Sequence, residues 1–561
     1  MQSDSNHPER TRRFAFAFPA RGLSFVIAAI CLLPMLAVAL AAMTGGTETL
    51  QHLAQTTLPR YTGNTALLAL LVALGTGALG TGAAWLVTMT KFPGVRFLEV
   101  TLALPLAFPA YVLAYAYTDF LDHPGLVQTL LRDMTGWGPR DYWFPEIRSL
   151  GGAAFMLILV LYPYVYLLAR AAFLQQSGTA FLAARTLGHS TWSTFFQINL
   201  PLARPAIAGG VLLAVMETIA DFGTVSYFGV QTFATGIYQS WFAMADRAAA
   251  AQLALALLTF ALLLALLERR QRGAAKHYSR NGRFEALPPI ELKGTAAWAA
   301  TALCALPVLI GFLLPVILLS TMAVGSEQNL LSARYLGFIQ NSLVLAGLAA
   351  LLTVAAAVVL GFAARLAPRP GTAAAREIAR IGYAVPGGVI AVGLIVPFAA
   401  FDNAVDAWMR ATFDISTGLL LTGSIWLLIL AYMVRFMAAA LNTYDSGLST
   451  INPHIDAVTR TLGRTPFGML RAVHLPLLTP SLLTAGLIVF IDVMKELPAT
   501  LIMRPFNYDT LAVQAHRLAS DERLDGAAVP SLVIVALAML PVILVCRGIG
   551  QQRAVAERNL R

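Results

Sequence analysis

Charged side chains are scarce in this sequence of 561 residues. Asp, Glu, Lys and Arg make up 12% of the chain, whereas 58% of it is hydrophobic. Soluble globular proteins carry about 25% charged residues. A surface built from this chain must therefore face something other than water over most of its area. The shortage of charge argues against a soluble domain and favours a membrane protein.

Cysteine and the common catalytic motifs are also rare or absent. The three cysteines, Cys31, Cys304 and Cys546, lie in apolar runs. Such isolated thiols indicate small buried hydrophobic residues rather than disulfides or a metal cluster. The sequence contains no GxxxxGK[ST], HExxH or GxSxG, so it lacks a phosphate-binding loop and familiar hydrolase sites. We expect no enzyme activity, catalytic residue, resident metal or cofactor, and energy must come from a partner or an ion gradient.

Long apolar runs are abundant. About 20 residues in a helix cross a hydrocarbon core of ~30 Å, and the alternating pattern of a membrane β-barrel is absent. The sequence therefore predicts an all-α polytopic membrane protein with about twelve transmembrane helices. We place them near residues 22–43, 64–88, 97–120, 150–174, 204–227, 249–268, 295–322, 341–364, 379–401, 417–440, 480–501 and 528–548.

The distribution of basic residues predicts the orientation. Arg10, Arg12 and Arg13 precede the first predicted helix, and the segment 268–294 between helices six and seven is also basic. Lys and Arg concentrate in cytoplasmic loops, so we expect both termini in the cytoplasm. The net charge of +10 then reflects the cytoplasmic loops of a protein whose partner is membrane lipid. It does not indicate a nucleic acid partner. The segment 268–294 reads most simply as a cytoplasmic linker; a docking or lipid-binding patch is the alternative.

The two halves of the chain resemble each other. RTLGHSTWSTFFQINLPLARPAI starts at Arg185, and RTLGRTPFGMLRAVHLPLLTPSL starts at Arg460, in the second half of the chain. Matching stretches before and after these segments are displaced by almost the same interval. The pattern predicts two parallel repeats of six helices each. We expect a first half at 1–270, a linker at 271–294 and a second half at 295–561.

Each RTLG segment predicts a short helical hairpin. Glycine suits the end of the first helical stretch, and the Leu-Pro pair starts or interrupts the next helix. Both segments would face the cytoplasm. Two knobs of the same shape would suit docking to a partner with two-fold symmetry.

Here the sequence resembles the "EAA" cytoplasmic loop of ABC-importer permeases. The matching positions are a glycine followed, after nine residues, by Ile/Val-x-Leu-Pro: Gly188, Ile198, Leu200 and Pro201 in the first copy, and Gly463, Val473, Leu475 and Pro476 in the second. The first copy keeps the alanine pair at Ala183 and Ala184. The leading Glu of the family falls on Leu182 and Ala457, which puts a docking contact through that carboxylate in doubt.

The resemblance extends over nearly the whole chain. A fused pair of permease halves that carries ADFGTVSYFGVQTFATGIYQSWF and KELPATLIMRPFNYDTLA looks like the iron(III) importer permeases. The resemblance implies a type I ABC-importer fold in a bacterial inner membrane. It also implies two ATPase subunits at the cytoplasmic loops and a periplasmic binding protein that delivers ferric iron. ATP would be bound by the partners. Related fused permeases carry other small solutes, so a different substrate remains open.

Four carboxylates in apolar runs are candidates for the translocation path. Glu217 and Asp221 form one i,i+4 pair, and Asp492 and Glu496 form the other. The spacing places each pair on one helix face. Carboxylates inside a membrane are costly and usually face a cavity, and their oxygens suit a hard cation. Alternatively they snorkel, cap a broken helix or pair internally, as Asp492 could with Lys495.

Other polar residues carry weaker hypotheses. Tyr111, Tyr115 and Tyr117 could bind ferric iron, but interfacial tyrosines are common. His189 and His474 are expected on the surface of the RTLG segments. The main alternative for the whole chain is a gradient-driven secondary transporter; a receptor or structural protein would give no reason for the duplicated carboxylates.

Overall fold

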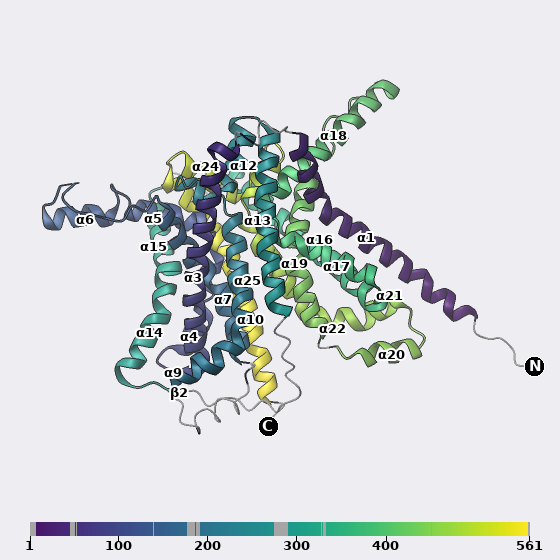
Figure 1. The fold of residues 1–561 in the computed structure, drawn as a ribbon, viewed down its shortest axis with the longest axis horizontal. Coiled ribbons are helices and arrows are strands. Elements are labelled where there is room, and N and C mark those ends of the chain that lie inside the picture. The colour runs from purple at the N-terminus through teal and green to yellow at the C-terminus, as the bar shows by residue number, and fades with distance from the viewer. Residues whose placement is uncertain are drawn as a thin grey trace, which may run out of the picture. The chain divides into compact units, whose positions relative to one another are not determined.

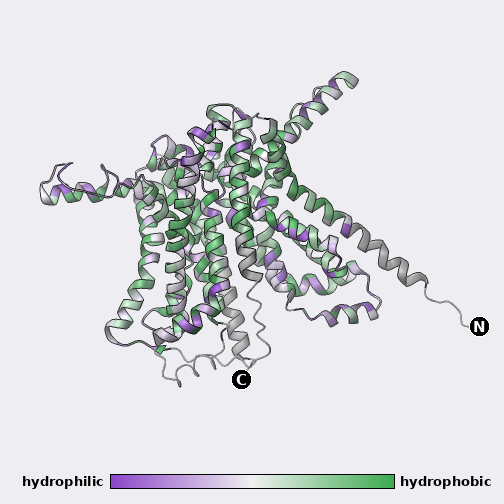
Figure 2. Ribbon diagram, viewed as in Figure 1, coloured by the Kyte–Doolittle hydropathy of each residue, from purple (hydrophilic) through white to green (hydrophobic). Residues whose placement is uncertain are grey.

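The computed structural model is helical over nearly all of the chain that it describes. It describes residues 7–44, 51, 53–138, 140–174, 176, 186, 191–273, 290–326, 328, 332–449 and 451–558. Within these ranges, eleven helices are long and apolar enough to cross a membrane, or twelve when one bent pair is counted as a span. The predicted all-α polytopic fold is confirmed. Figure 2 shows hydrophobic residues along the long helices, whereas hydrophilic residues gather on short helices such as α17 and α20.

The helices form two compact units, and each unit draws on both halves of the sequence. The first-half unit contains residues 47–245, 259–335 and 511–561. The second-half unit contains residues 1–46, 246–258 and 336–510. The end helices are thus exchanged between the halves, which a linear division of the sequence does not reveal.

Three long helices form the core of the first-half unit. They are α3 (Leu58–Met89), α7 (Leu150–Leu174) and α10 (Leu200–Ala220), and α7 packs against both of the others (Figure 1). A Cβ atom at Gly210 would lie 2.7 Å from the Cα of Val165. The absence of a side chain therefore lets α10 approach α7 closely, as small residues do in membrane helix pairs.

The remaining elements of this unit include two segments from the second half of the sequence. Helices α14, α15 and α25 pack against the first-half helices or against one another. A two-residue parallel ladder joins β1 to β2. The elements are β1 (Thr90–Lys91), α4 (Val95–Thr101), α5 (Ala110–Leu121), α6 (Leu126–Thr135), α9 (Thr191–Thr194), α11 (Gly223–Tyr227), α12 (Phe233–Tyr238), most of α13 (Arg247–Gly273), β2 (Ile290–Glu291), α14 (Gly294–Val308), α15 (Leu314–Val324), α24 (Leu511–Ser520) and α25 (Leu524–Arg558).

The second-half unit is built around α16 (Ala333–Leu366), α19 (Ile425–Ser449) and α22 (Leu475–Met494). The N-terminal helix α1 packs here, against α17 and α18 (Figure 1). A Cβ atom at Gly393 would lie 2.3 Å from the carbonyl oxygen of Pro34, so glycine is needed where α18 meets α1. The other helices are α1 (His7–Thr44), α17 (Pro370–Ile381), α18 (Gly387–Phe413), α20 (Pro453–Thr461), α21 (Pro466–Met469) and α23 (Pro498–Met503).

Several predicted helix boundaries were wrong. The helix expected over 97–120 is interrupted before Pro109, where the helix pair on either side bends by 92°, because proline pushes the preceding residue out of the helical region. The ninth and tenth spans begin at Gly387 and Ile425 rather than at 379 and 417. The fifth and eleventh end at Ala220 and Met494, before the second carboxylate of each predicted pair.

Candidate coupling segments and intramembrane carboxylates

Both RTLG segments lead into a long apolar helix through the same local structure. A five-residue π-helical stretch, Phe195–Asn199 in the first and Leu470–His474 in the second, leads directly into α10 or α22. The N–H of Leu200 donates to the carbonyl of Phe195, and the N–H of Leu475 donates to that of Leu470. The proline that follows has no N–H, so one backbone hydrogen bond of the helix is missing there. A π-helical turn accommodates such an interruption of the hydrogen-bond ladder.

The first segment is described at residue 186 and over residues 191–207. Ile198, Leu200 and Pro201 are half-buried at the start of α10. Ala183, Ala184 and Gly188 lie outside the described residues. Their predicted contact with a partner stays a prediction.

The second segment is described almost completely. Gly463 has φ of +74° after α20, a conformation in which glycine has no steric penalty. Val473 and Leu475 are half-buried, and Pro476 is exposed. Four apolar side chains of the hairpin are exposed by between 37% and 75%: Ile455, Val458, Leu462 and Phe467. They lie among exposed polar residues such as Arg460 and Arg464.

The inward side of α20 carries a buried acid, Asp456. Its Oδ1 lies 2.9 Å from Nε2 of His474, and its Oδ2 accepts a hydrogen bond of 2.6 Å from Nε of Arg365. His474 is fully buried, and its ring meets the edge of Phe362 at 5.3 Å between centroids. The expectation that His474 lies on the surface was therefore wrong. His189 lies outside the described residues.

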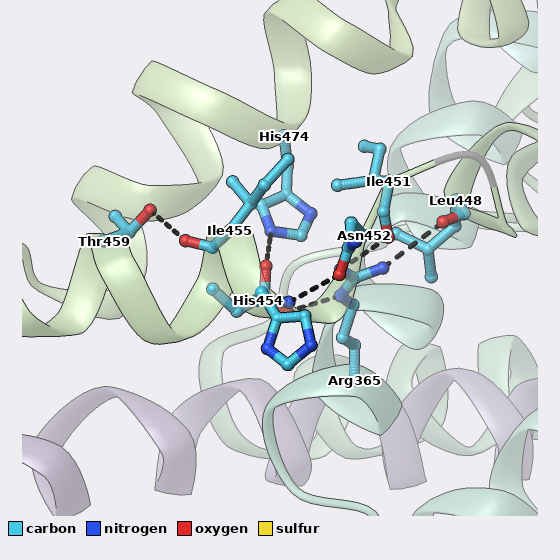
Figure 3. A network of polar contacts seen from close by, with 9 residues as sticks. Arg365, Leu448, Ile451, Asn452, His454, Ile455, Thr459 and His474 are labelled. Atoms are coloured by element: carbon cyan, nitrogen blue, oxygen red, sulfur yellow. Dashed lines mark hydrogen bonds and ion pairs between the residues drawn. The ribbon is translucent and has the colours of Figure 1, made fainter.

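Arg365, at the end of α16, completes this network. Figure 3 shows its guanidinium directed toward the main chain of Leu448 and Ile451. Its Nη1 donates to the carbonyl of Leu448 at 3.3 Å, and its Nη2 donates to that of Ile451 at 3.1 Å. Leu448 is in the last turn of α19, where carbonyls lack partners within the helix and favour a cation.

The electrostatics of the network favour an ionised Asp456. Burial disfavours the charged carboxylate, but the hydrogen bonds and charge of Arg365, together with the contact from His474, outweigh that cost. The pKa of Asp456 consequently lies below its ordinary value. Asp456 is thus a carboxylate held by a cation at the base of α20.

Asp221 lies at a break in the fifth span rather than on a continuous helix. Helix α10 ends at Ala220, and Asp221 has an extended backbone. Its carboxylate accepts hydrogen bonds of 3.1 Å from the backbone N–H groups of Thr224 and Val225 and from the hydroxyl of Thr224. The donors belong to the first turn of α11, where N–H groups have no helical partner.

Glu496 has the corresponding arrangement at the start of α23. It accepts hydrogen bonds from the N–H of Ala499 at 2.8 Å and from the N–H of Thr500 at 3.1 Å. Its Oε1 also lies 3.4 Å from Nη1 of the buried Arg435. A Cβ atom at Gly387 would lie 2.3 Å from Arg435 and 2.7 Å from Glu496, so glycine leaves room for this ion pair.

The other two carboxylates lie one turn earlier. Glu217 is half-buried on α10. Asp492 pairs with Lys495, 3.0 Å away, as the sequence alternative suggested. The prediction that each pair shares one helix face was wrong, because the helices end before Asp221 and before Glu496. Whether the four line a path stays a prediction.

The tyrosines of α5 are buried rather than interfacial. Tyr111, Tyr115 and Tyr117 are each no more than 3% exposed. The hydroxyl of Tyr115 lies 2.9 Å from Nδ1 of His516, and that of Tyr117 donates to the carbonyl of Ile310 at 2.6 Å. Among the described residues, no group of three or more His, Cys, Asp or Glu is placed to hold a metal ion.

Sequence reasoning missed Arg365, Arg435 and His516. Arg435 carried a usable signal, since an arginine inside an apolar run usually faces a partner within the bundle. Arg365 and His516 join groups far away in sequence, so their partners could not be read from local spacing. Cys31 and Cys304 are buried free thiols, as expected.

Comparison with known proteins agrees with this architecture. Residues 14–273 match the family described as the binding-protein-dependent transport system inner membrane component. The Fe(3+)-transport system permease protein FbpB 2 of Haemophilus influenzae is 28% identical over 91% of this chain and 94% of its own length. The ferric transport system permease protein FbpB of Actinobacillus pleuropneumoniae is 23% identical over 79% of this chain and 64% of its own.

A shorter relative aligns with part of the chain only. The molybdenum transport system permease protein ModB of Escherichia coli is 32% identical over 26% of this chain and 60% of its own length. The fold and these similarities define a multi-pass helical membrane protein of the permease class. Over residues 14–273 the chain is similar to the inner membrane components of binding-protein-dependent transport systems.

Proposed function

We propose that the chain is the membrane-spanning subunit of an ATP-driven importer for ferric iron. A periplasmic binding protein delivers the ion, and two ATPase subunits dock on the cytoplasmic RTLG segments. The protein lies in the bacterial inner membrane with both termini in the cytoplasm. The chain itself binds no nucleotide and performs no catalysis.

The match to a ferric permease over almost the full length of both chains carries this proposal. The family name supplies the dependence on a binding protein. The sequence has no phosphate-binding loop of its own, so ATP hydrolysis belongs to a separate subunit.

The second RTLG segment supports docking by shape and apolar contact. Val458 is 56% exposed, Leu462 is 75% exposed and Phe467 is 51% exposed, although they lie beside a buried ionic network. Exposed apolar groups on a short hairpin are typical of a contact surface. The acid next to the family's glutamate position, Asp456, points inward, so it is not part of that surface.

The carboxylates divide into two roles in this proposal. Asp221 and Glu496 stabilise the helix breaks after α10 and α22 by hydrogen bonds to the next short helix. They thereby set the shape of the translocation path. Glu217 and Asp492 lie one turn earlier and lower the energy of a cation that passes them. A site that held a trivalent ion tightly would slow its release, so we propose attraction without a fixed ligand set.

The test is uptake by the complex reconstituted in liposomes. The chain would be combined with the ATPase and the binding protein encoded near its gene, and uptake of radioactive ferric iron would be measured. We expect uptake only with ATP and loaded binding protein. A chain that carries iron alone under a proton or sodium gradient would support the secondary transporter instead. If binding protein loaded with molybdate or sulfate stimulated the ATPase, and ferric-loaded binding protein did not, the proposal of ferric iron as the substrate would be wrong.

A further inference from the structure

A buried ionic contact ties helix α20, beside the second RTLG segment, to the neighbouring helices. The residues that form this contact are not repeated in the first half of the sequence. We propose that Arg365, Asp456 and His474 are positioning residues that fix α20 against the transmembrane helices, so that movement of the ATPase is transmitted through α20 as a rigid body. This inference rests on the proposed function only for its coupling role; the bracing itself is a property of the chain alone.

Asp456 is the point at which α20 is tied to other helices. Of the nine residues in α20, Asp456 and Thr459 are the buried ones. The hydroxyl of Thr459 donates to Ile455 within the same helix at 2.7 Å. Asp456 instead reaches Arg365 on α16 and His474 at the base of α22. Release of the Asp456 carboxylate would therefore free the whole helix.

Arg365 spreads the restraint over several elements. Its guanidinium contacts Asp456, the end of α19 at Leu448 and the connection at Ile451. Its side chain is 13% exposed and that of Asp456 is 10% exposed. Opening the contact would leave a buried cation without its anion, which makes the closed state strongly preferred.

The first half has different chemistry at the corresponding positions. When the two RTLG segments are aligned, Phe181 stands in place of the aspartate and Asn199 in place of the histidine. When the preceding helices are aligned at their NT and NS dipeptides, Thr88 stands in place of the arginine. Asn199 exchanges hydrogen bonds with Gln176, at 2.7 Å and 2.8 Å, and Thr88 bonds to Ala84 within its own helix at 2.7 Å. The first-half positions thus carry no ionisable side chain, so this ionic contact cannot form there.

The bracing is tested on the full chain in lipid nanodiscs by hydrogen–deuterium exchange. Asp456→Asn and Arg365→Gln should each speed exchange of the amides of residues 453–462 by about tenfold or more, because a buried pair loses one partner. Arg376→Gln is the matched control, since it removes a contact to Asp445 on α19 in the same unit. Unchanged exchange in both variants would overturn the proposal. If they fail to fold, His474→Asn, which installs the first-half residue, replaces them and should also speed exchange.

The coupling role is tested on the complex with the ATPase. Asp456→Asn should lower the amount of substrate moved per ATP hydrolysed by about threefold or more, and Arg365→Lys, which keeps the cation, should lose less than Arg365→Gln. Faster exchange with an unchanged ratio would reduce the network to a structural role and overturn the proposal. If the unmodified chain bound no ATPase, the proposed function would fail, but the exchange result would still decide the bracing.

Discussion

Asp221 and Glu496 occupy equivalent positions in the two halves of the sequence, and each accepts hydrogen bonds from the backbone N–H groups three and four residues further along. Each also accepts a hydrogen bond from a threonine hydroxyl in the short helix that follows. A carboxylate at the N-terminal end of a helix satisfies N–H groups that have no helical partner and interacts favourably with the helix dipole. The same device therefore shapes the break after α10 and the break after α22.

Asp221→Asn separates the structural role of this carboxylate from its charge. Asparagine accepts the same backbone hydrogen bonds, so the apparent melting temperature in detergent should stay close to that of the unmodified chain. Asp221→Ala should lose about 0.5–2 kcal/mol of stability, as other helix-capping residues do. Because cation attraction is assigned to Glu217, Glu217→Gln should lower ferric uptake by about fivefold, since unit charges 4 Å apart attract by about 1 kcal/mol in water. Asp221→Asn should leave ferric uptake nearly unchanged.

Loss of the acid at the second break should be more damaging. Glu496→Gln leaves Arg435, which is 8% exposed, without its anion, and breaking a buried pair in this way costs about 3–5 kcal/mol. We expect a large fall in the apparent melting temperature measured by intrinsic fluorescence. The double variant with Arg435→Gln should recover part of the loss, because no unpaired charge remains.

Glu377→Gln is the control for the Glu496 variant. Its carboxylate pairs with Arg380 at 2.7 Å, but the side chain of Glu377 is 41% exposed, so the loss should stay below about 1 kcal/mol. If the Glu377 and Glu496 variants lost equal stability, the buried pair of Glu496 with Arg435 would contribute no more to stability than an exposed pair.

Substitution of Gly463 should disturb the hairpin without a steric clash. No atom lies within 4 Å of a Cβ added there, so the cost comes from the positive φ alone. Gly463→Ala should cost about 1 kcal/mol, whereas Gly463→Asn should cost less because asparagine tolerates this conformation. Affinity for the ATPase, measured by surface plasmon resonance, should follow the same order. Tighter binding by the alanine variant than by the glycine chain would contradict the role assigned to this turn.

Stability should fall below neutral pH because of His516. Burial lowers its pKa from 6.5 to about 4, so the unfolded chain binds the proton more readily. The contribution is fully present above about pH 6.5 and is lost as the pH falls toward 4, at up to about 1.4 kcal/mol per unit. His516→Gln should flatten the fall in melting temperature between pH 7 and pH 5. The exposed His454 is the control, and its replacement should leave the fall in melting temperature between pH 7 and pH 5 unchanged. If that fall were also unchanged in His516→Gln, His516 would not be its cause.

Composition and apolar run length were enough to predict the helical membrane fold and most of the spans. The span at residues 150–174 was predicted to the residue, because its apolar run has clear ends. The exchange of α1 and α25 between the two units could not be predicted in this way, since an apolar helix carries no local mark of the neighbour against which it packs.

The site was predictable in part for similar reasons. Spacing found Asp221 and Glu496, but it treated the helix as continuous and so placed them on one face with Glu217 and Asp492. The break depends on competition between side-chain and backbone hydrogen bonds. Asp456 was overlooked because its importance depends on Arg365, 91 residues earlier in the chain, and a single sequence gives no sign of that contact.

Transport by the purified, reconstituted complex tests the central claim most directly. Liposomes holding the chain and its ATPase would receive ATP inside and ferric-loaded binding protein outside. The account predicts ferric uptake that requires ATP, the binding protein and an intact second RTLG segment, and that stops when residues 463–476 are replaced by a flexible linker of equal length. Uptake that persists without ATP, or that survives this replacement, would contradict it.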